Sequence, residues 1–427
     1  MEISIRDIGV VHKADIRLDG LTVIAGENGV GKSAIGKALY CFTQSIVKLS
    51  EHSSNDILKR FTSYLFQHID SADRDFLKNL IDPENKYYNK KELQNILLTL
   101  RNKYPDLAET WQNNDKNRTF SFDHRMIVAE AHDQLIQSVF GSSYHNKLSN
   151  KKESLIEAPT LVHKEQTIFH INDNKSTLGG IFSTKYLGSP IVIETPLTLS
   201  NYQYIKENLA FNNQQNALLP DYTKKLIRKL SESSYNPDYT QPLCKTIQDI
   251  IQGQILIEND QLFYKDKKEN KHPIQSVATG IKSLGMLQLL VAGGAIKEDT
   301  ILIIDEPEIH LHPSWQLAYA KIIVELVKEG INVLITSHSS TFIEALKVYS
   351  ENEGVNQKTN FYLGKMTEKG SVFEEVTESL EPIYKAFAAP SLELMLEKSR
   401  GKYQKRASAG LAQEQQAPYS TKDKQDF

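Results

Sequence analysis

One octapeptide near the start of the chain constrains its fold more than any other segment. Residues 26–33 read Gly-Glu-Asn-Gly-Val-Gly-Lys-Ser and match G-x-x-x-x-G-K-[ST] at every position. The apolar run 21–25 precedes them, and a stretch with helical character, 34–42, follows. A strand, a glycine-rich loop and a helix N-terminus form a phosphate cradle, because backbone N–H groups converge on the anion. A plain glycine-rich turn is the alternative, and the flanking strand and helix argue against it.

Each residue of this loop has an expected role toward a nucleoside triphosphate. Lys32 would reach the β- and γ-phosphates, and Ser33 would be a ligand of Mg²⁺. The remaining nucleotide-binding positions are Asn28, Gly29, Val30 and Gly31. The sequence therefore predicts a triphosphate site with a bound magnesium ion.

A second motif lies far along the chain. The run 301–304 is purely apolar and mostly β-branched, which is typical of a buried parallel strand, and it ends in Asp305-Glu306-Pro307-Glu308. A carboxylate at the C-terminal end of a central strand lies at the ligand edge of the sheet. We expect Asp305 to hold the Mg²⁺ shell and Glu306 to polarise the attacking water. The alternative is a strand that ends in a solvated acidic turn.

A third motif follows after a predicted helix, 313–328. Residues 331–336 form the next expected strand, which ends at Ser337-His338-Ser339. Strand, helix and strand make a βαβ unit that carries His338 to the same sheet edge. A lone histidine is more often a satisfied polar side chain. Its place one strand from Glu306 favours a sensor of the γ-phosphate.

Composition limits the remaining classes of protein. The 427 residues allow two or three domains, or one large domain with insertions. The chain has no 18-residue apolar run and no signal peptide, so neither a membrane span nor a membrane partner is expected. Its two cysteines, Cys41 and Cys244, show no metal or disulfide spacing, which suits a cytoplasmic location. A net charge of −3 gives no global nucleic-acid footprint.

The nucleotide motifs are split between the two ends of an α/β chain. No Asn-Lys-x-Asp motif is present, which argues against a simple GTPase. A split ATPase head explains the spacing, with two lobes that meet around a central elaboration. We expect five segments: an N-terminal ATPase lobe (1–50), a helical insertion (51–155), a mixed strand and helix region (156–252), a C-terminal ATPase lobe (253–397) and a flexible tail (398–427).

Four segments carry a resemblance to a known family. The opening run 8–29, the segment 276–283, the motif 305–313 and the motif 336–339 are similar to ABC-type AAA ATPases of the SMC, RecF, RecN and OLD group. The chain looks close to the stand-alone ATPase subunits of bacterial anti-phage systems, of the Septu or PARIS type. The resemblance implies an ABC/SMC-type head, in which a mixed sheet surrounds the phosphate-loop core.

The resemblance also assigns further residues. Ser276, Thr279 and Gly280 match the signature motif, whose helix N-terminus would bind the γ-phosphate held by a second subunit. Their departure from Leu-Ser-Gly-Gly-Gln argues against a membrane transporter, and an ordinary N-cap by Ser276 or Thr279 is the alternative. His310 and His312 fall in the family's D-loop, with a zinc site as the alternative. The family's mobile-loop glutamine has three candidates: Gln44, Gln134 and Gln203.

Three functions remain open at this point. The first is an Mg²⁺-dependent ATPase that forms a homodimer or a larger homo-oligomer. It would act as the sensor and scaffold for a separately encoded nuclease or toxin. This partner would dock on residues 51–250 or after Phe387. The second is a RecF- or SMC-like repair ATPase that binds DNA. The third is a nucleotide-gated assembly protein with negligible turnover, against which Glu306 argues. No nuclease pattern of the OLD, zinc-hook or His-Asn-His type is visible in the sequence.

Overall fold

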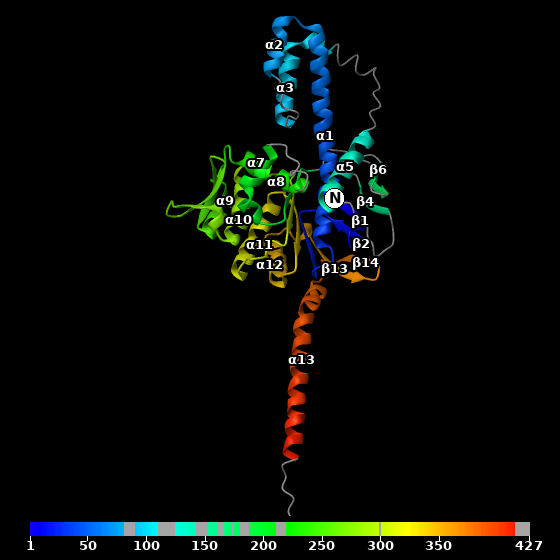
Figure 1. The fold of residues 1–427 in the computed structure, drawn as a ribbon, viewed down its shortest axis with the longest axis vertical. Helices are drawn as coiled ribbons and strands as arrows, with labels where there is room; N and C mark the ends of the chain where they lie inside the picture. Colours follow the sequence, from blue (N-terminus) through cyan, green and yellow to red (C-terminus); the bar gives the residue numbers. More distant parts are fainter. Residues whose placement is uncertain are drawn as a thin grey trace, which may run out of the picture.

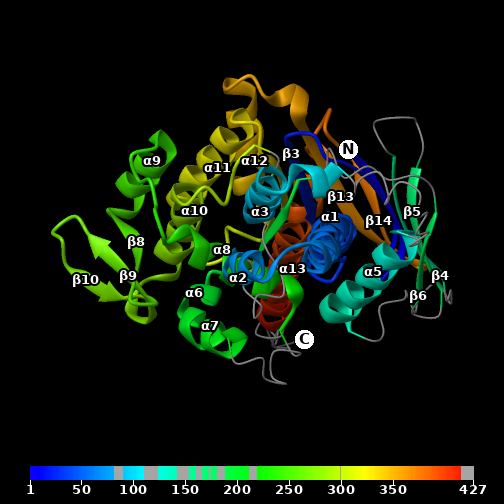
Figure 2. The ribbon, with the colours of Figure 1, turned by 90° about the horizontal axis from the view of Figure 1, so that it is seen from above.

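A mixed sheet of 11 strands organises the molecule, and helices cover both of its faces (Figures 1 and 2). The computed structural model describes residues 1–80, 90–109, 124–141, 153–159, 166–172, 175–179, 188–210, 219–298 and 300–414. From one edge to the other the strands are β6 (Lys175–Gly179), β5 (Gln166–Asn172), β4 (Glu153–Pro159), β1 (Glu2–Ile8), β2 (Val11–Arg17), β14 (Gly370–Glu375), β13 (Thr359–Thr367), β3 (Leu21–Gly26), β12 (Asn332–Ser337), β11 (Ile301–Asp305) and β7 (Pro190–Ile193). The expected α/β class with a mixed sheet is confirmed.

Five neighbouring strands of this sheet are parallel, and they carry the expected motifs. β13, β3, β12, β11 and β7 run in one direction, so their C-terminal ends meet at one edge. The remaining strands form a wing in which β1 pairs antiparallel with β2 and β4. The parallel half therefore brings the ends of β3, β11 and β12 together although they are far apart in sequence.

The central strands are apolar on both faces because both faces are covered. In β3, Val23 belongs to one core and Ile24 to the other, as side chains alternate across the sheet. Leu334 and Ile335 repeat the alternation in β12. A fully buried parallel strand has a continuous apolar run in its sequence, which is the pattern that identified these strands.

The helices divide between the two faces. The structure describes α1 (Lys32–His68), α2 (Ser71–Leu80), α3 (Lys90–Lys103), α5 (His124–Phe140), α6 (Leu197–Ser200), α7 (Tyr202–Ala210), α8 (Asp221–Ser233), α9 (Pro242–Ile251), α10 (Thr279–Ala292), α11 (Pro313–Lys328), α12 (Ser340–Asn352) and α13 (Glu381–Glu414). Helices α1 and α5 share the core of one face, and α9 to α12 share the core of the other. The two faces thus separate α1, which begins at the phosphate loop, from α10, which begins at the signature segment.

A second, smaller sheet lies beside α9 and α10. β8 (Gly253–Glu258), β9 (Gln261–Asp266) and β10 (Lys271–Pro273) form it, followed by the 3₁₀ turn Ile274–Ser276. Asn259 and Asp260 have φ angles of 48° and 63°, so both central residues of the β8–β9 turn are left-handed. Hairpins with two-residue loops favour this conformation.

Two helical projections leave the body of the molecule at opposite ends (Figure 1). At one end α1 continues past the sheet and packs with α2 and α3 through Leu65, Leu77, Ile96 and Leu100. The expected lobe boundary at residue 50 therefore lies inside a continuous helix. Such a helix joins the projection to the phosphate loop mechanically.

The other projection is α13, which continues to Glu414. This differs from the flexible tail expected from residue 398, and residues 415–427 lie outside the described part. The segment is rich in Ala, Lys, Glu, Gln and Arg, which are strong helix formers, so a polar composition here favours a helix. Among the described residues, every helix is too short or too polar to span a lipid bilayer.

Candidate nucleotide-binding site

The phosphate loop adopts a conformation that requires glycine. Gly26, Gly29 and Gly31 have φ angles of 154°, 85° and 87°. A Cβ atom on Gly26 would lie 2.9 Å from Val30 Cγ2, and one on Gly31 would lie 2.7 Å from a Val10 methyl group. Asn28 and Gly29 are exposed at the tip, whereas Val30 is buried and anchors the loop. The loop thus presents backbone N–H groups while its base is fixed by packing.

Lys32 is the first residue of α1 and its side chain is only 4% exposed. Its Nζ donates to the carbonyl oxygens of Gly26 and Glu27, each at 3.0 Å. The same Nζ lies 3.3 Å from Glu306 Oε1. The ammonium group is therefore held inside the loop and next to the acidic motif.

Ser33, Asp305 and Thr336 form the adjoining oxygen cluster. Ser33 Oγ donates to Asp305 Oδ1 at 2.9 Å, and Thr336 Oγ1 donates to the same oxygen. Burial raises the pKa of the Asp305 carboxyl, and Glu306 adds to the rise, while the Thr336 and Ser33 hydroxyls and Lys37 oppose it. Mg²⁺ prefers oxygen ligands and commonly uses one or two carboxylates together with substrate phosphates. The hydroxyl and the carboxylate therefore fit this ion, whose charge would offset the burial of Asp305.

Glu306 lies between the lysine and the histidine. Its backbone has a φ angle of 46°, and its N–H donates to the carbonyl and hydroxyl oxygens of Thr336, each at 3.1 Å. Oε1 faces Lys32, while Oε2 lies 3.4 Å from His338 Nδ1. The register of β11 with β12, in which Asp305 pairs with Thr336, produces this arrangement. The structure thus brings Lys32, Ser33, Asp305, Glu306 and His338 together, as the sequence predicts.

A comparison with protein families agrees with this geometry. A family profile described as AAA ATPase domain matches residues 1–343. The chain belongs to this family.

A curated relative and solved structures are similar over different lengths. The Old nuclease of Escherichia phage P2 is 28% identical over 107 residues, which are 25% of this chain and 17% of that protein. The chain therefore matches about a sixth of that relative's length. An SMC head domain from Thermotoga maritima is 11% identical with a TM-score of 0.40, over 88% of this chain and 98% of its own. An SMC head with an extended coiled coil, bound to the C-terminal domain of ScpA derived from Pyrococcus furiosus, is 13% identical with a TM-score of 0.42, over 93% and 98%.

One acidic residue at the site of this AAA ATPase chain is absent from the predictions. Glu194 follows β7, whose Ile193 pairs with Ile304 of β11, so Glu194 and Asp305 end neighbouring strands. Tyr222 donates its hydroxyl to Glu194 Oε2 at 2.8 Å, and Lys37 Nζ lies 2.7 Å from Oε1. The signal in the sequence is the apolar run before Glu194, which resembles the run before Asp305.

The three glutamine candidates for the mobile loop lie elsewhere. Gln44 is buried in α1 and accepts a hydrogen bond from Lys225. Gln134 is exposed on α5, and Gln203 is exposed on α7, where it donates to Glu207. Each sits on a helix rather than at a strand end, so none of the three lies at the ligand edge of the sheet.

The signature segment opens α10 without a side-chain cap. Ser276 is exposed and donates to the Pro273 carbonyl at 2.8 Å, and the N-cap residue is Ala278. The alternative of an N-cap by Ser276 or Thr279 is therefore wrong. Gly280 is buried, and a Cβ atom there would lie 3.1 Å from Leu311 and 3.2 Å from Trp315. Within the described residues, no hydrogen bond or ion pair joins residues 276–280 to the phosphate loop.

His310 and His312 have separate roles in the turn before α11. His310 is exposed with a φ angle of 67°. His312 is the N-cap of α11, where its Nδ1 accepts from Ser314 N at 3.3 Å. In the described part of the chain, no three His, Cys, Asp or Glu side chains gather as a metal site. The zinc alternative for this pair therefore has no third ligand there.

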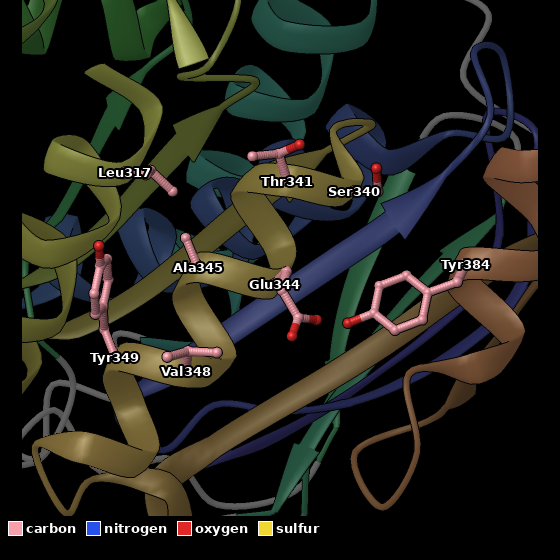
Figure 3. Close-up of a pocket in the computed structure, with 8 residues that line it drawn as sticks. All are labelled: Leu317, Ser340, Thr341, Glu344, Ala345, Val348, Tyr349 and Tyr384. Atoms are coloured by element: carbon pink, nitrogen blue, oxygen red, sulfur yellow. The ribbon is translucent and has the colours of Figure 1, made fainter. Parts of the chain in front are cut away.

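A groove of about 570 Å³ lies between α11, α12 and the start of α13 (Figure 3). It begins at Ser340, two residues after His338, and Tyr384 of α13 closes its other side. The lining also includes Leu317, Thr341, Glu344, Ala345, Val348 and Tyr349. The groove is a separate feature from the phosphate loop, and it borders α12, the helix that follows His338.

Proposed function

We propose that this chain is an Mg²⁺-dependent ATPase. The observation that carries the proposal is the Ser33–Asp305 hydrogen bond of 2.9 Å with Glu306 beside it, because a hydroxyl and a carboxylate next to a phosphate loop are oxygen ligands of the kind that Mg²⁺ prefers. Membership of the AAA ATPase domain family supports the same activity. The assignment of ATP rather than GTP rests on the missing Asn-Lys-x-Asp motif.

Each residue then has a defined task. Lys32 leaves the Gly26 and Glu27 carbonyls and binds the β- and γ-phosphates. Ser33 and Asp305 would hold Mg²⁺, which would neutralise phosphate charge. Glu306, released from Lys32, orients the attacking water, and His338 binds near the γ-phosphate. Catalysis of this kind depends on positioning and electrostatics more than on covalent chemistry by the protein.

We further propose that two chains share each nucleotide. The first N–H groups of α10 lack a side-chain cap, and a helix N-terminus in this state favours an anion. Since α10 and α1 belong to the cores of opposite sheet faces, Ser276, Thr279 and Gly280 are better placed to reach a phosphate on a second copy. His310 and His312 would then lie at the seam between the copies.

The wider role proposed is that of a sensor and scaffold in a two-component anti-phage defence complex. The ATPase state would control a separately encoded nuclease or toxin through contacts that differ between nucleotide states. The similarity to Old nuclease, which covers 25% of this chain, is compatible with an ATPase that works together with a nuclease. A RecF- or SMC-like repair ATPase that binds DNA is equally compatible with the same motifs.

Two measurements test these proposals separately. ATP hydrolysis by the purified chain with and without Mg²⁺ tests the activity, and Glu306→Gln is the matched inactive variant. Purification of the chain expressed from its native operon tests the wider role. A co-purifying nuclease or toxin supports the defence role, whereas recovery of the chain alone with tight DNA binding supports the repair role.

A further inference from the structure

Glu308 is a buried carboxylate that the proposed ATPase chemistry does not use. It lies in the turn after Asp305 and Glu306, and its side chain is only 3% exposed. No Lys or Arg of the described chain forms an ion pair with it. A buried carboxylate is costly unless hydrogen bonds compensate it, and a turn in itself needs no acid at this position.

Both close partners of Glu308 belong to the end of β12. Glu308 Oε1 accepts a hydrogen bond from Ser337 Oγ at 2.6 Å and another from His338 N at 2.9 Å. These hydrogen bonds thereby connect the turn after β11 to the segment that carries His338. Hydrogen bonds to a charged acceptor are stronger than neutral ones, so this tie fixes the backbone of His338 firmly.

The same oxygen also faces the imidazole ring of His338. His338 Nδ1 lies 3.6 Å from Glu308 Oε1 and 3.4 Å from Glu306 Oε2, while the side chain as a whole is 41% exposed. Two acceptors beside Nδ1 favour the ring form with the proton on Nδ1, which leaves Nε2 free on the open side. The Glu308 carboxylate is held in place by its two hydrogen bonds from Ser337 and His338. The Glu306 carboxylate instead also pairs with Lys32.

Glu308 and its neighbours Ser337 and Tyr319 are buried. The Oε2 atom of Glu308 is buried and has no hydrogen-bond partner among the described residues. Burial raises the pKa of Glu308, while Ser337 and His338 oppose the rise. Burial also raises the pKa of Tyr319 on α11, a hydrogen bond with Ser283 opposes the rise, and Glu308 adds to it. The groups that face the carboxylate are therefore His338, Ser337 and Tyr319, with Glu306 across the ring. A low local dielectric strengthens the bonds that Oε1 makes.

We propose that Glu308 is a positioning residue for His338. It holds the end of β12 and the Nδ1 edge of His338, so that Nε2 is presented to the nucleotide and Glu306 stays available for the water. This inference rests on the proposed ATPase function. The competing explanation is that Glu308 only stabilises the turn, in which case its effect on turnover does not depend on His338.

A kinetic double-mutant cycle tests the inference. Glu308→Ala should lower kcat by about tenfold or more, as misplaced groups do, while KM for ATP stays within about twofold. Glu308→Gln keeps an acceptor oxygen and should restore most of the activity. The Glu308→Ala/His338→Ala double variant should be no slower than His338→Ala, since residues that act through one another are not additive. Additive losses would overturn the proposal. Glu351→Ala, an exposed carboxylate on α12, is the control and should leave kcat unchanged.

A second measurement does not depend on hydrolysis. ¹⁵N chemical shifts of the His338 ring in the nucleotide-free protein report which nitrogen carries the proton. Wild type and Glu308→Gln should favour the Nδ1–H form, and Glu308→Ala should show a mixture. If wild type fails to hydrolyse ATP but Glu308→Ala still shifts the tautomer, the proposed function fails and the positioning role stands. If the ring is unaffected, the positioning role is refuted. Should Glu308→Ala not fold, Ser337→Ala replaces it, because it removes one of the two fixing bonds.

Discussion

Ser33 Oγ donates a hydrogen bond to Asp305 Oδ1 at 2.9 Å, although 272 residues separate them in the chain. The contact forms because β3 and β11 flank β12 in the parallel half of the sheet, so that the loop after β3 meets the end of β11. The described parts of the intervening segment form helices, strands β4 to β6 of the antiparallel wing, β7 and a second small sheet. The strand order, rather than any local feature, therefore assembles the site.

Replacement of Lys32 by alanine should abolish nucleotide binding. The variant loses the point charge that contacts the β- and γ-phosphates. Isothermal titration with Mg-ATP should show no measurable heat for Lys32→Ala, whereas Lys365→Ala, an exposed lysine on β13, should titrate like wild type. Unchanged ATP affinity in Lys32→Ala would rule out the assigned role.

Glu306→Gln should separate binding from turnover. The amide keeps the size of the side chain but cannot act as a general base, so kcat should fall by about 10²-fold or more. Titration should show that ATP affinity is retained or increased, since the Lys32–Glu306 ion pair no longer competes with phosphate. Steady-state hydrolysis at the wild-type rate would show that another group orients the water.

His338→Ala should reduce turnover with less effect on affinity. The ring is 41% exposed beside Glu306, so its removal leaves the phosphate loop intact. We expect kcat to fall by about tenfold, which corresponds to about 1.4 kcal/mol. An ATP affinity lost as completely as in Lys32→Ala would instead indicate that His338 is part of the binding loop.

The stability of the chain should depend on pH through Glu308. Burial raises the pKa of Glu308 above its ordinary value of 4.5, so its contribution to the free energy of unfolding is present below pH 4.5 and is lost as pH rises through the raised pKa. Glu308→Gln has no such group. Chemical denaturation should therefore show similar free energies of unfolding for wild type and Glu308→Gln below pH 4.5. As pH increases, the free energy of unfolding of the variant should rise relative to that of wild type. A constant difference across this range would contradict the direction of the shift.

Two inactive variants should complement each other if chains share nucleotides. Lys32→Ala lacks the phosphate-binding side and Thr279→Arg blocks the signature side, so a mixed dimer keeps one intact site. In an equimolar mixture about a quarter of all sites should be active, as expected for random two-fold assembly. Light scattering of Glu306→Gln with ATP should show at least a dimer. A strictly monomeric enzyme with no complementation would exclude the shared site.

The sequence by itself determined the parts of the nucleotide site. The phosphate loop is a local motif, and the continuous apolar runs before Asp305 and Ser337 identified buried parallel strands whose ends share one edge. Helix 313–328 also followed from a local pattern, and the structure has it at that position. These features depend on neighbours in sequence, so periodicity and turn chemistry are enough to predict them.

Only the tertiary structure decided which distant residues join them. Glu194 reaches the site because β7 pairs with β11, and a strand pairing across more than a hundred intervening residues leaves no trace in either segment alone. Burial of Glu308 against β12, and the length of α1 through residue 50, depend likewise on packing that local composition does not specify. The polar C-terminal segment was also not predictable from local composition. Its residues suit either a solvated tail or an exposed helix, and no local pattern distinguishes the two.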